Sequence, residues 1–192
     1  MDRRFGKHIT PNDKILEIWT WLWDFASYCL HRWVKEYTWI EIDEWLTDKL
    51  WKKFNNYKIL CVDALDFFQN TTEKFDVIYM SHVFEHFTIE EWIVLARYIC
   101  EHLAHQGTWI NIMPNAWCIT GCLGRYSDIT HKTIYSSNSF NQVLLRAWFT
   151  KNKIHHFNMF PHGFVKKMLT KLLWKFLWVE YSSFQLLTII KK

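Results

Sequence analysis

The chain has 192 residues, of which 22% are charged and 19% aromatic, and it carries a net charge of +4 at neutral pH. This length suits one domain with a full-sized core, and the composition is that of a globular chain, which excludes a disordered one. The charge is too small to indicate nucleic acid as a partner. No apolar run approaches the roughly 18 residues of a membrane span, and no apolar signal-peptide core follows Met1. We therefore expect a single cytoplasmic domain over residues 1–192.

Strand and helix signals alternate along the chain without a linker or a repeat. Short apolar runs predict strands, and apolar stripes behind N-cap residues predict helices. Asp43 is placed as an N-cap, and Thr88 with Glu91 forms a capping box. In chain order we expect a strand at 14–18, helix 23–32, strand 36–42, helix 43–55, strand 58–62, helix 64–69, strand 75–80, helix 88–103, strand 108–113, a polar stretch at 125–138, helix 139–147, strand 152–157, helix 162–178 and strand 183–190. This alternation favours a parallel sheet covered on both faces.

Tryptophan stands at several positions where the surrounding pattern is typical of glycine. The chain has 13 Trp and only 5 Gly in 192 residues, so glycine is about 2.6% (5/192) against an average near 7%. With glycine at 19, 21 and 23, residues 15–25 read ILEIGTGLGDF, a strand that enters a GxGxG turn and then a helix. Such a turn brings backbone amides close to a ligand. Its residues need φ values that are unfavourable for any residue with a side chain, so glycine is preferred. The same replacement restores a helix stop at Trp33, a strand at Trp39 and a turn at Trp148.

Three origins of these tryptophans are open. The chain is a degenerate protein that lost its ligand, or it was altered deliberately, or its gene uses UGA for glycine and was translated with a table that reads UGA as tryptophan. Random decay scatters substitutions among many residue types, whereas these changes go to one type at glycines with unrelated tasks. This pattern favours miscoding, which predicts UGA at codons 19, 21 and 23, whereas UGG there indicates genuine tryptophans.

The GxGxG spacing, together with Glu41 twenty residues beyond Trp21, resembles the class I S-adenosylmethionine-dependent methyltransferases over residues 12–190. The resemblance implies a Rossmann-like α/β fold. Its sheet has seven mostly parallel strands in the order 3-2-1-4-5-7-6, the last antiparallel, with helices on both faces. It also implies S-adenosylmethionine as the cofactor and methyl transfer to a small-molecule or lipid-linked sugar acceptor, with no nucleic acid as partner.

The resemblance also implies which residues meet the cofactor. An acid at the tip of the second strand, here Glu41, accepts hydrogen bonds from the ribose hydroxyls. The pair Asp63-Ala64 matches the adenine side, and Glu17 matches the acid near the methionine end. The expected cofactor-binding positions are Glu17, Trp19, Trp21, Trp23, Glu41, Asp63, Ala64 and Ser81. With tryptophan at three of them the site is obstructed, so a non-enzymatic scaffold with a plugged pocket is the alternative function.

Histidines gather after the fourth predicted strand, in the segment 81–87, SHVFEHF, which resembles the family's loop beside the sulfonium. His82 and His86 have the i,i+4 spacing of metal ligands, but no third ligand follows at suitable spacing, so no metal is assigned. They either shape the pocket rim or contact substrate or cofactor, with His86 as the candidate general base.

Two further segments point to the acceptor. The segment 125–131, RYSDITH, resembles the substrate side of methyltransferases that act on bacterial surface sugars and lipid-linked intermediates. This resemblance makes Asp128 and His131 candidate contacts with the acceptor. The alternative is that the segment is a solvated loop without a role. Lysines at 167, 171 and 175 form one stripe of the expected helix 162–178. This stripe is either a solvated edge or a peripheral contact with the inner face of an anionic membrane.

Overall fold

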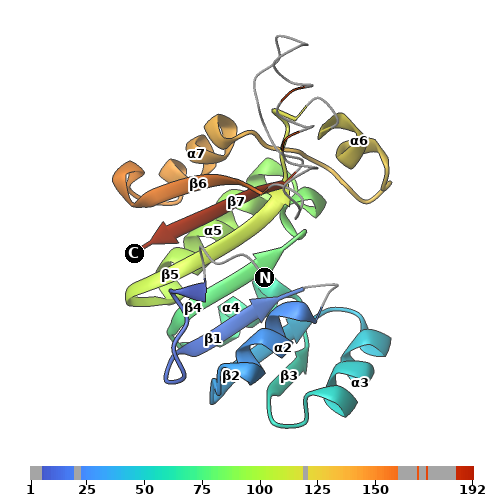
Figure 1. Ribbon diagram of the computed structural model, residues 1–192, viewed down its shortest axis with the longest axis vertical. Coiled ribbons are helices and arrows are strands. Elements are labelled where there is room, and N and C mark those ends of the chain that lie inside the picture. Colours follow the sequence, from blue (N-terminus) through green and yellow to red (C-terminus); the bar gives the residue numbers. More distant parts are fainter. Residues whose placement is uncertain (1–5, 20–22, 119–120, 160–167, 169–171, 173–184) are drawn as a thin grey trace.

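The computed structural model describes residues 6–19, 23–118, 121–159, 168, 172 and 185–192 (Figure 1). The expected helix at 162–178 and Trp21 therefore lie outside the described residues, apart from positions 168 and 172. No helix in the described part of the chain is long and apolar enough to cross a membrane.

A seven-stranded sheet forms the centre of the protein (Figure 1). Its order, β3-β2-β1-β4-β5-β7-β6, is the predicted one. The first five strands run parallel, and β7 is antiparallel to both of its neighbours, β5 and β6. The strands are β1 (Lys14–Ile18), β2 (Glu36–Glu41), β3 (Lys58–Cys61), β4 (Phe75–Ser81), β5 (Leu103–Pro114), β6 (Ile154–Met159) and β7 (Gln185–Lys191). The predicted Rossmann-like fold is confirmed.

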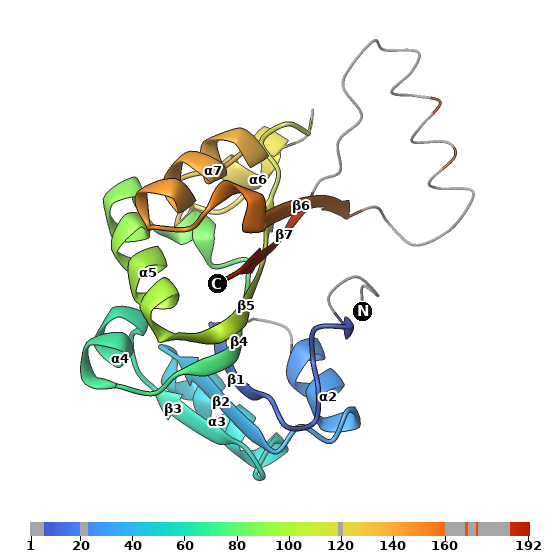
Figure 2. The same cartoon turned by 90° about the vertical axis from the view of Figure 1, so that its left-hand side faces the viewer.

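Helices cover both faces of the sheet, as Figure 2 shows. They are α2 (Asp24–His31), α3 (Glu44–Lys53), α4 (Ala64–Asn70), α5 (Ile89–His102), α6 (Gly121–Tyr126) and α7 (Ser137–Arg146), with short 3-10 turns η1 (Phe84–His86) and η2 (Lys151–Lys153). Helices α4, α5 and α7 bury their apolar residues in one core, and α2 and α3 bury theirs in the core on the other face. Burial of these two apolar layers drives the strand–helix alternation to fold in this way.

The predicted helix starts are confirmed by side-chain caps. The Asp43 carboxylate accepts a hydrogen bond from the backbone N–H of Leu46 at 2.7 Å. Thr88 and Glu91 make both hydrogen bonds of a capping box before α5. These bonds satisfy amides that the first helical turn leaves unpaired.

Most observed boundaries lie within two residues of the prediction, and two features of the chain differ more. Strand β5 begins at Leu103, five residues before the expected start, because α5 passes directly into it and a register irregularity in β4 lets Leu103 pair with Phe75. Helix α6 reaches Tyr126, within a stretch from Arg125 that was expected to be a polar loop. The early start of β5 has no local signal, since it depends on pairing with the distant strand β4.

Candidate cofactor and acceptor site

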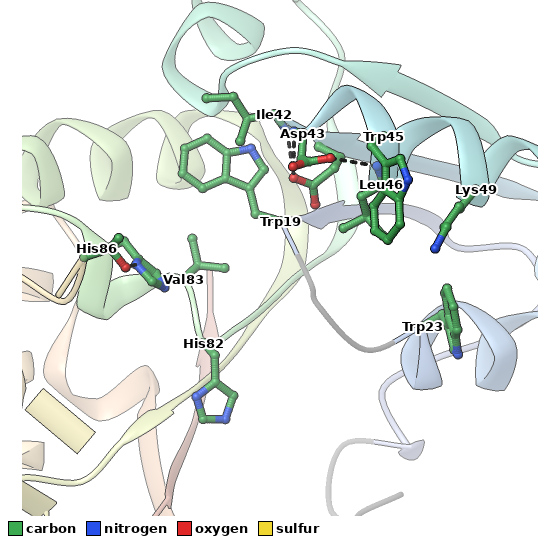
Figure 3. A pocket seen from close by; sticks show the side chains of 12 residues that line it. Trp19, Trp23, Ile42, Asp43, Trp45, Leu46, Lys49, His82, Val83 and His86 are labelled. Carbon is green, nitrogen blue, oxygen red and sulfur yellow. Dashed lines mark hydrogen bonds between the residues drawn. The ribbon is translucent and has the colours of Figure 1, made fainter. Parts of the chain in front are cut away.

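A cavity of about 540 Å³ opens beyond the carboxyl ends of β1, β2 and β4 (Figure 3). The strand order changes direction between β1 and β4, and ligands of open α/β sheets bind at such a switch point. The cavity is lined by Trp19, Trp23, Glu41, Ile42, Asp43, Trp45, Leu46, Lys49, His82, Val83, His86 and Thr130. The predicted cofactor loop, acid and histidine segment thus meet at one place.

Glu41 ends β2 and is only 5% exposed, although it lines the cavity. Its Oε1 accepts hydrogen bonds from the backbone N–H groups of Ile42 at 2.8 Å and Asp43 at 3.1 Å. Burial raises the pKa of Glu41, against the lowering effect of these two amides. The result is a carboxyl group fixed in orientation at the cavity wall.

Trp19 follows β1 with a left-handed backbone, φ 46°. Its N–H donates to the carbonyl of Ile40 at 3.0 Å, which fixes the chain at this turn. The indole stacks on Phe87 with ring centroids 5.3 Å apart, and its buried ring N–H has no hydrogen-bond partner within the described residues. The backbone at 19 therefore has a conformation that favours glycine, while the indole lies at the cavity wall (Figure 3). Glu41 lines the same cavity.

The wall opposite the histidines is aromatic and basic. Trp23 precedes α2 and lines the cavity, with the Lys53 ammonium 3.8 Å from its ring centroid. Trp45 and Lys49 form a second such pair at 3.3 Å (Figure 3). Each pair is a cation–π contact, so these rings line the cavity beside lysine charges.

Two more tryptophans occupy left-handed positions, Trp33 with φ 60° and Trp148 with φ 69°. Each stands just after a helix. After α2, Trp33 N–H donates to the Leu30 carbonyl and Val34 N–H to that of Cys29, both at 3.1 Å. After α7, Trp148 and Phe149 repeat the same pair of bonds. These are Schellman motifs, in which glycine usually holds the position of the two tryptophans.

The remaining expected cofactor positions lie outside the described lining of the cavity. Glu17 is buried and accepts a hydrogen bond from the Tyr37 hydroxyl. Asp63 caps α4 by accepting from the backbone N–H of Leu65 at 2.7 Å, and Ala64 is buried behind it. Ser81 ends β4 and is partly buried. Their expected contacts with a cofactor stay predictions.

His82 lies directly after β4 with φ 57° and is held from both ring nitrogens. Its Nε2 lies 2.8 Å from the side-chain nitrogen of Gln185, and its Nδ1 lies 3.1 Å from Glu85 Oε1. Since the Gln185 amide nitrogen can only donate, Nε2 accepts, and the Nδ1–H group donates to Glu85. His82 is thereby oriented at the cavity wall by β7 and η1.

His86 and His131 lie side by side, with ring centroids 4.8 Å apart. The Thr130 hydroxyl donates to Asp128 at 2.6 Å, and hydrogen bonds from Thr130 hold the pKa of Asp128 below its ordinary value. Thr130 Oγ1 therefore accepts from the Nδ1–H of His86 at 2.9 Å, which leaves the lone pair on His86 Nε2. Burial lowers the pKa of His86, which favours the neutral imidazole.

His86 therefore lies beside His131, and His82 and His86 both line the cavity, while the catalytic roles expected for these three histidines stay predictions. Sequence reasoning missed Glu85 and Thr130 as members of the group. The signal for Glu85 was its place between two histidines in SHVFEHF. Thr130 had no such signal, because only the fold places it next to His86.

Several solved structures with a similar fold are methyltransferases. An S-adenosylmethionine-dependent methyltransferase from Archaeoglobus fulgidus matches with a TM-score of 0.76 and 16% identity, over 99% of this chain and 90% of that one. The N-methyltransferase NodS from Bradyrhizobium japonicum, solved with S-adenosylhomocysteine, gives 0.65 and 13%, over 94% and 79%. The plantazolicin methyltransferase BamL, solved with a triazolic desmethylPZN analogue and S-adenosylhomocysteine, gives 0.64 and 17%, over 93% and 76%. The fold is therefore that of the S-adenosylmethionine-dependent methyltransferases.

The sequence itself places the chain in a family. The profile of a family described as a methyltransferase domain matches residues 5–172, most of the chain, and the protein belongs to this methyltransferase family. No curated protein sequence matches it significantly.

Proposed function

We propose that the cavity is built for S-adenosylmethionine and for methyl transfer to a small-molecule acceptor. One observation carries the proposal. The buried carboxyl of Glu41 ends β2, the left-handed backbone at position 19 directly follows β1, and both residues line the same cavity. This pairs an acceptor for ribose hydroxyls with a turn suited to close backbone approach. S-adenosylmethionine supplies an electrophilic methyl group when bound, and two of the similar structures contain its demethylated product.

The side chain of Trp19 does not fit this cofactor. Its indole packs on Phe87 and lines the cavity where a glycine would leave room for the ligand. We therefore propose that the glycine-containing form of the chain is the methyltransferase. In the polypeptide with tryptophan at 19, 21 and 23, the fold is a scaffold with a plugged pocket, which is the alternative function.

Binding of S-adenosylmethionine tests the proposal. We expect no binding by the chain with its tryptophans, and micromolar binding after Trp19→Gly, Trp21→Gly and Trp23→Gly together, measured by isothermal titration calorimetry. The double variant Trp33→Gly, Trp148→Gly is the matched control, because it makes the same change at left-handed positions that do not line the described cavity. Micromolar binding by the unaltered chain, or none by the triple variant, contradicts the proposal.

On the acceptor side, we propose that His82, His86, His131 and Asp128 contact the substrate. The Nε2 lone pair of His86 is a candidate base for an acceptor that must lose a proton. The resemblance of residues 125–131 to enzymes of surface-sugar synthesis supports a lipid-linked or sugar acceptor. A cytoplasmic location, with peripheral membrane contact through residues 162–178, completes the proposal.

A further inference from the structure

Three side chains of types that bind metal ions lie close together beside the cavity, and one of them, His86, lines it. One donor atom from each of Glu85, His86 and His131 lies within 4.8 Å of the other two. The ligand atoms of a tetrahedral zinc site, with bonds of about 2.1 Å, lie about 3.4 Å apart. In the structure the three donors are therefore at most about 1.4 Å farther apart than the ligands of one zinc ion.

Glu85 carries an unmatched acceptor at this place. Its side chain is only 2% exposed, and its Oε2 is buried without a hydrogen-bond partner among the described residues. Its Oε1 is engaged by His82 at 3.1 Å. A buried carboxylate oxygen without a partner is costly, and such groups are normally paired or bound to a metal ion. The vacant acceptor is the observation that points to a cation.

The two histidines are oriented as metal ligands are. His86 donates its Nδ1–H to Thr130, and the Nδ1 of His131 is hydrogen-bonded to the Gly124 carbonyl, which can only accept. Both rings therefore carry their lone pairs on Nε2. A ligating histidine usually donates its second ring nitrogen to a carbonyl or another oxygen in this way, which fixes its tautomer.

The chain also holds the third ligand in place. The backbone N–H groups of Lys132 and Thr133 donate to the Glu85 carbonyl at 2.6 and 3.2 Å. The Thr133 hydroxyl donates to the carbonyl of Phe87 at 3.0 Å, and the Lys132 ammonium pairs with Glu91 at 3.2 Å. These contacts attach the segment that carries His131 to η1 and to the start of α5.

We propose that Glu85, His86 and His131 bind one divalent transition-metal ion. Two imidazoles and one carboxylate suit Zn²⁺ or a similar first-row ion, whereas Mg²⁺ and Ca²⁺ prefer oxygen ligands alone. Three protein ligands leave a coordination position open. His86 lines the cavity, so this position is open to a ligand that enters it.

The role of the open coordination position rests on the proposed function, which is methyl transfer to an acceptor in this cavity. A metal ion beside the acceptor coordinates an oxygen of the substrate and lowers the pKa of a bound hydroxyl. The acceptor class is then a hydroxyl-bearing compound, and His86 Nε2 is a ligand instead of a free base. Binding of the metal itself does not require the cofactor.

Metal binding is tested with the chain that retains its tryptophans, so the result is independent of cofactor binding. We expect Co²⁺ titrated into the metal-free protein to give visible absorption that saturates at one ion per chain. Zn²⁺ should displace it, and Mg²⁺ in large excess should not. Glu85→Gln, His86→Ala and His131→Ala should each weaken Co²⁺ binding at least tenfold. His105→Ala is the matched control, since His105 is exposed on β5 and lies outside the cluster.

Saturation at one ion with unchanged affinity in Glu85→Gln and His131→Ala places the ion elsewhere and overturns the proposal. Absence of Co²⁺ and Zn²⁺ binding overturns it as well. Glu85 is buried, so circular dichroism checks that its variant is folded. If that variant unfolds, His131→Ala decides the outcome, because His131 is partly exposed. Metal binding without cofactor binding by the glycine-restored chain contradicts only the proposed function.

Discussion

Trp33 and Trp148 show at single residues what a side chain costs at a position whose backbone favours glycine. Both are left-handed, and both are largely exposed, at 81% and 60%, so their rings gain little from burial. A side chain in this conformation costs roughly 1–2 kcal/mol. The three tryptophans at 19, 33 and 148 stand where the sequence pattern already indicated glycine, which supports a replacement of glycine by tryptophan.

Replacing either exposed tryptophan by glycine should therefore stabilise the protein. For Trp33→Gly and Trp148→Gly we expect the free energy of unfolding to rise by about 1 kcal/mol each, measured by urea denaturation. Trp45→Gly is the control, because Trp45 is 67% exposed but lies within helix α3. There glycine should lower the stability by up to about 1 kcal/mol. Equal effects at all three positions would show that backbone conformation is not the cause.

Glu41 gives a prediction for cofactor binding in the glycine-restored chain. Glu41→Ala removes charge-assisted hydrogen bonds worth about 1.5–3 kcal/mol each, so the affinity for S-adenosylmethionine should fall at least tenfold in calorimetry. Burial raises the pKa of Glu41, and only the ionised form is a pure acceptor. Affinity should therefore fall on acidification at a higher pH than an ordinary glutamate would give. Glu41→Gln should remove this pH dependence, and an unchanged dissociation constant in Glu41→Ala would refute the ribose assignment.

At the scale of elements, His156 joins β6 to β7 and α7. Its Nδ1 lies 2.8 Å from the Thr188 hydroxyl, and its Nε2 lies 3.0 Å from the Asn141 side-chain oxygen. Since that amide oxygen only accepts, Nε2–H donates to it and Nδ1 accepts from Thr188. Burial lowers the pKa of His156 from 6.5 to about 4. The neutral ring is thus part of the packing of these three elements.

This pKa shift makes stability depend on pH in one direction. Unfolded His156 takes up a proton near pH 6.5 while the folded ring resists it to about pH 4, so stability falls as the pH drops between these values. We expect a loss of about 2 kcal/mol, after allowance for partial exposure. Urea denaturation at pH 7 and pH 4.5 should show a smaller loss for His156→Gln than for the unaltered chain. The same loss in both proteins would rule out His156 as its source.

At the scale of the whole molecule, the strand order sets the place of the site. Strands β1 and β4 are neighbours, and their carboxyl ends carry Trp19 and His82, while β2 brings Glu41 to the same edge. Ligands of open α/β sheets bind at this edge. Residues more than sixty positions apart therefore share one cavity.

The sequence by itself determined the order of strands and helices, the acid at the tip of β2 and the positions that favour glycine. These features depend on hydrophobic periodicity, caps and short motifs, which act over a few residues. Asp43 and Thr88 were recognisable as caps for this reason. The strand order followed from the family resemblance, which the sheet confirms.

Only the tertiary structure decided how the site is filled. His131 lies 45 residues beyond His86 in the sequence, and hydrogen bonds from Lys132 and Thr133 to Glu85 bring it into the histidine cluster. The stacking of Trp19 on Phe87 likewise joins the end of β1 to the segment after β4. No local pattern encodes such contacts, because they form only when the sheet has set the spacing of its strand ends. The cluster that we propose as a metal site, Glu85, His86 and His131, likewise includes His131 only because the fold brings it there.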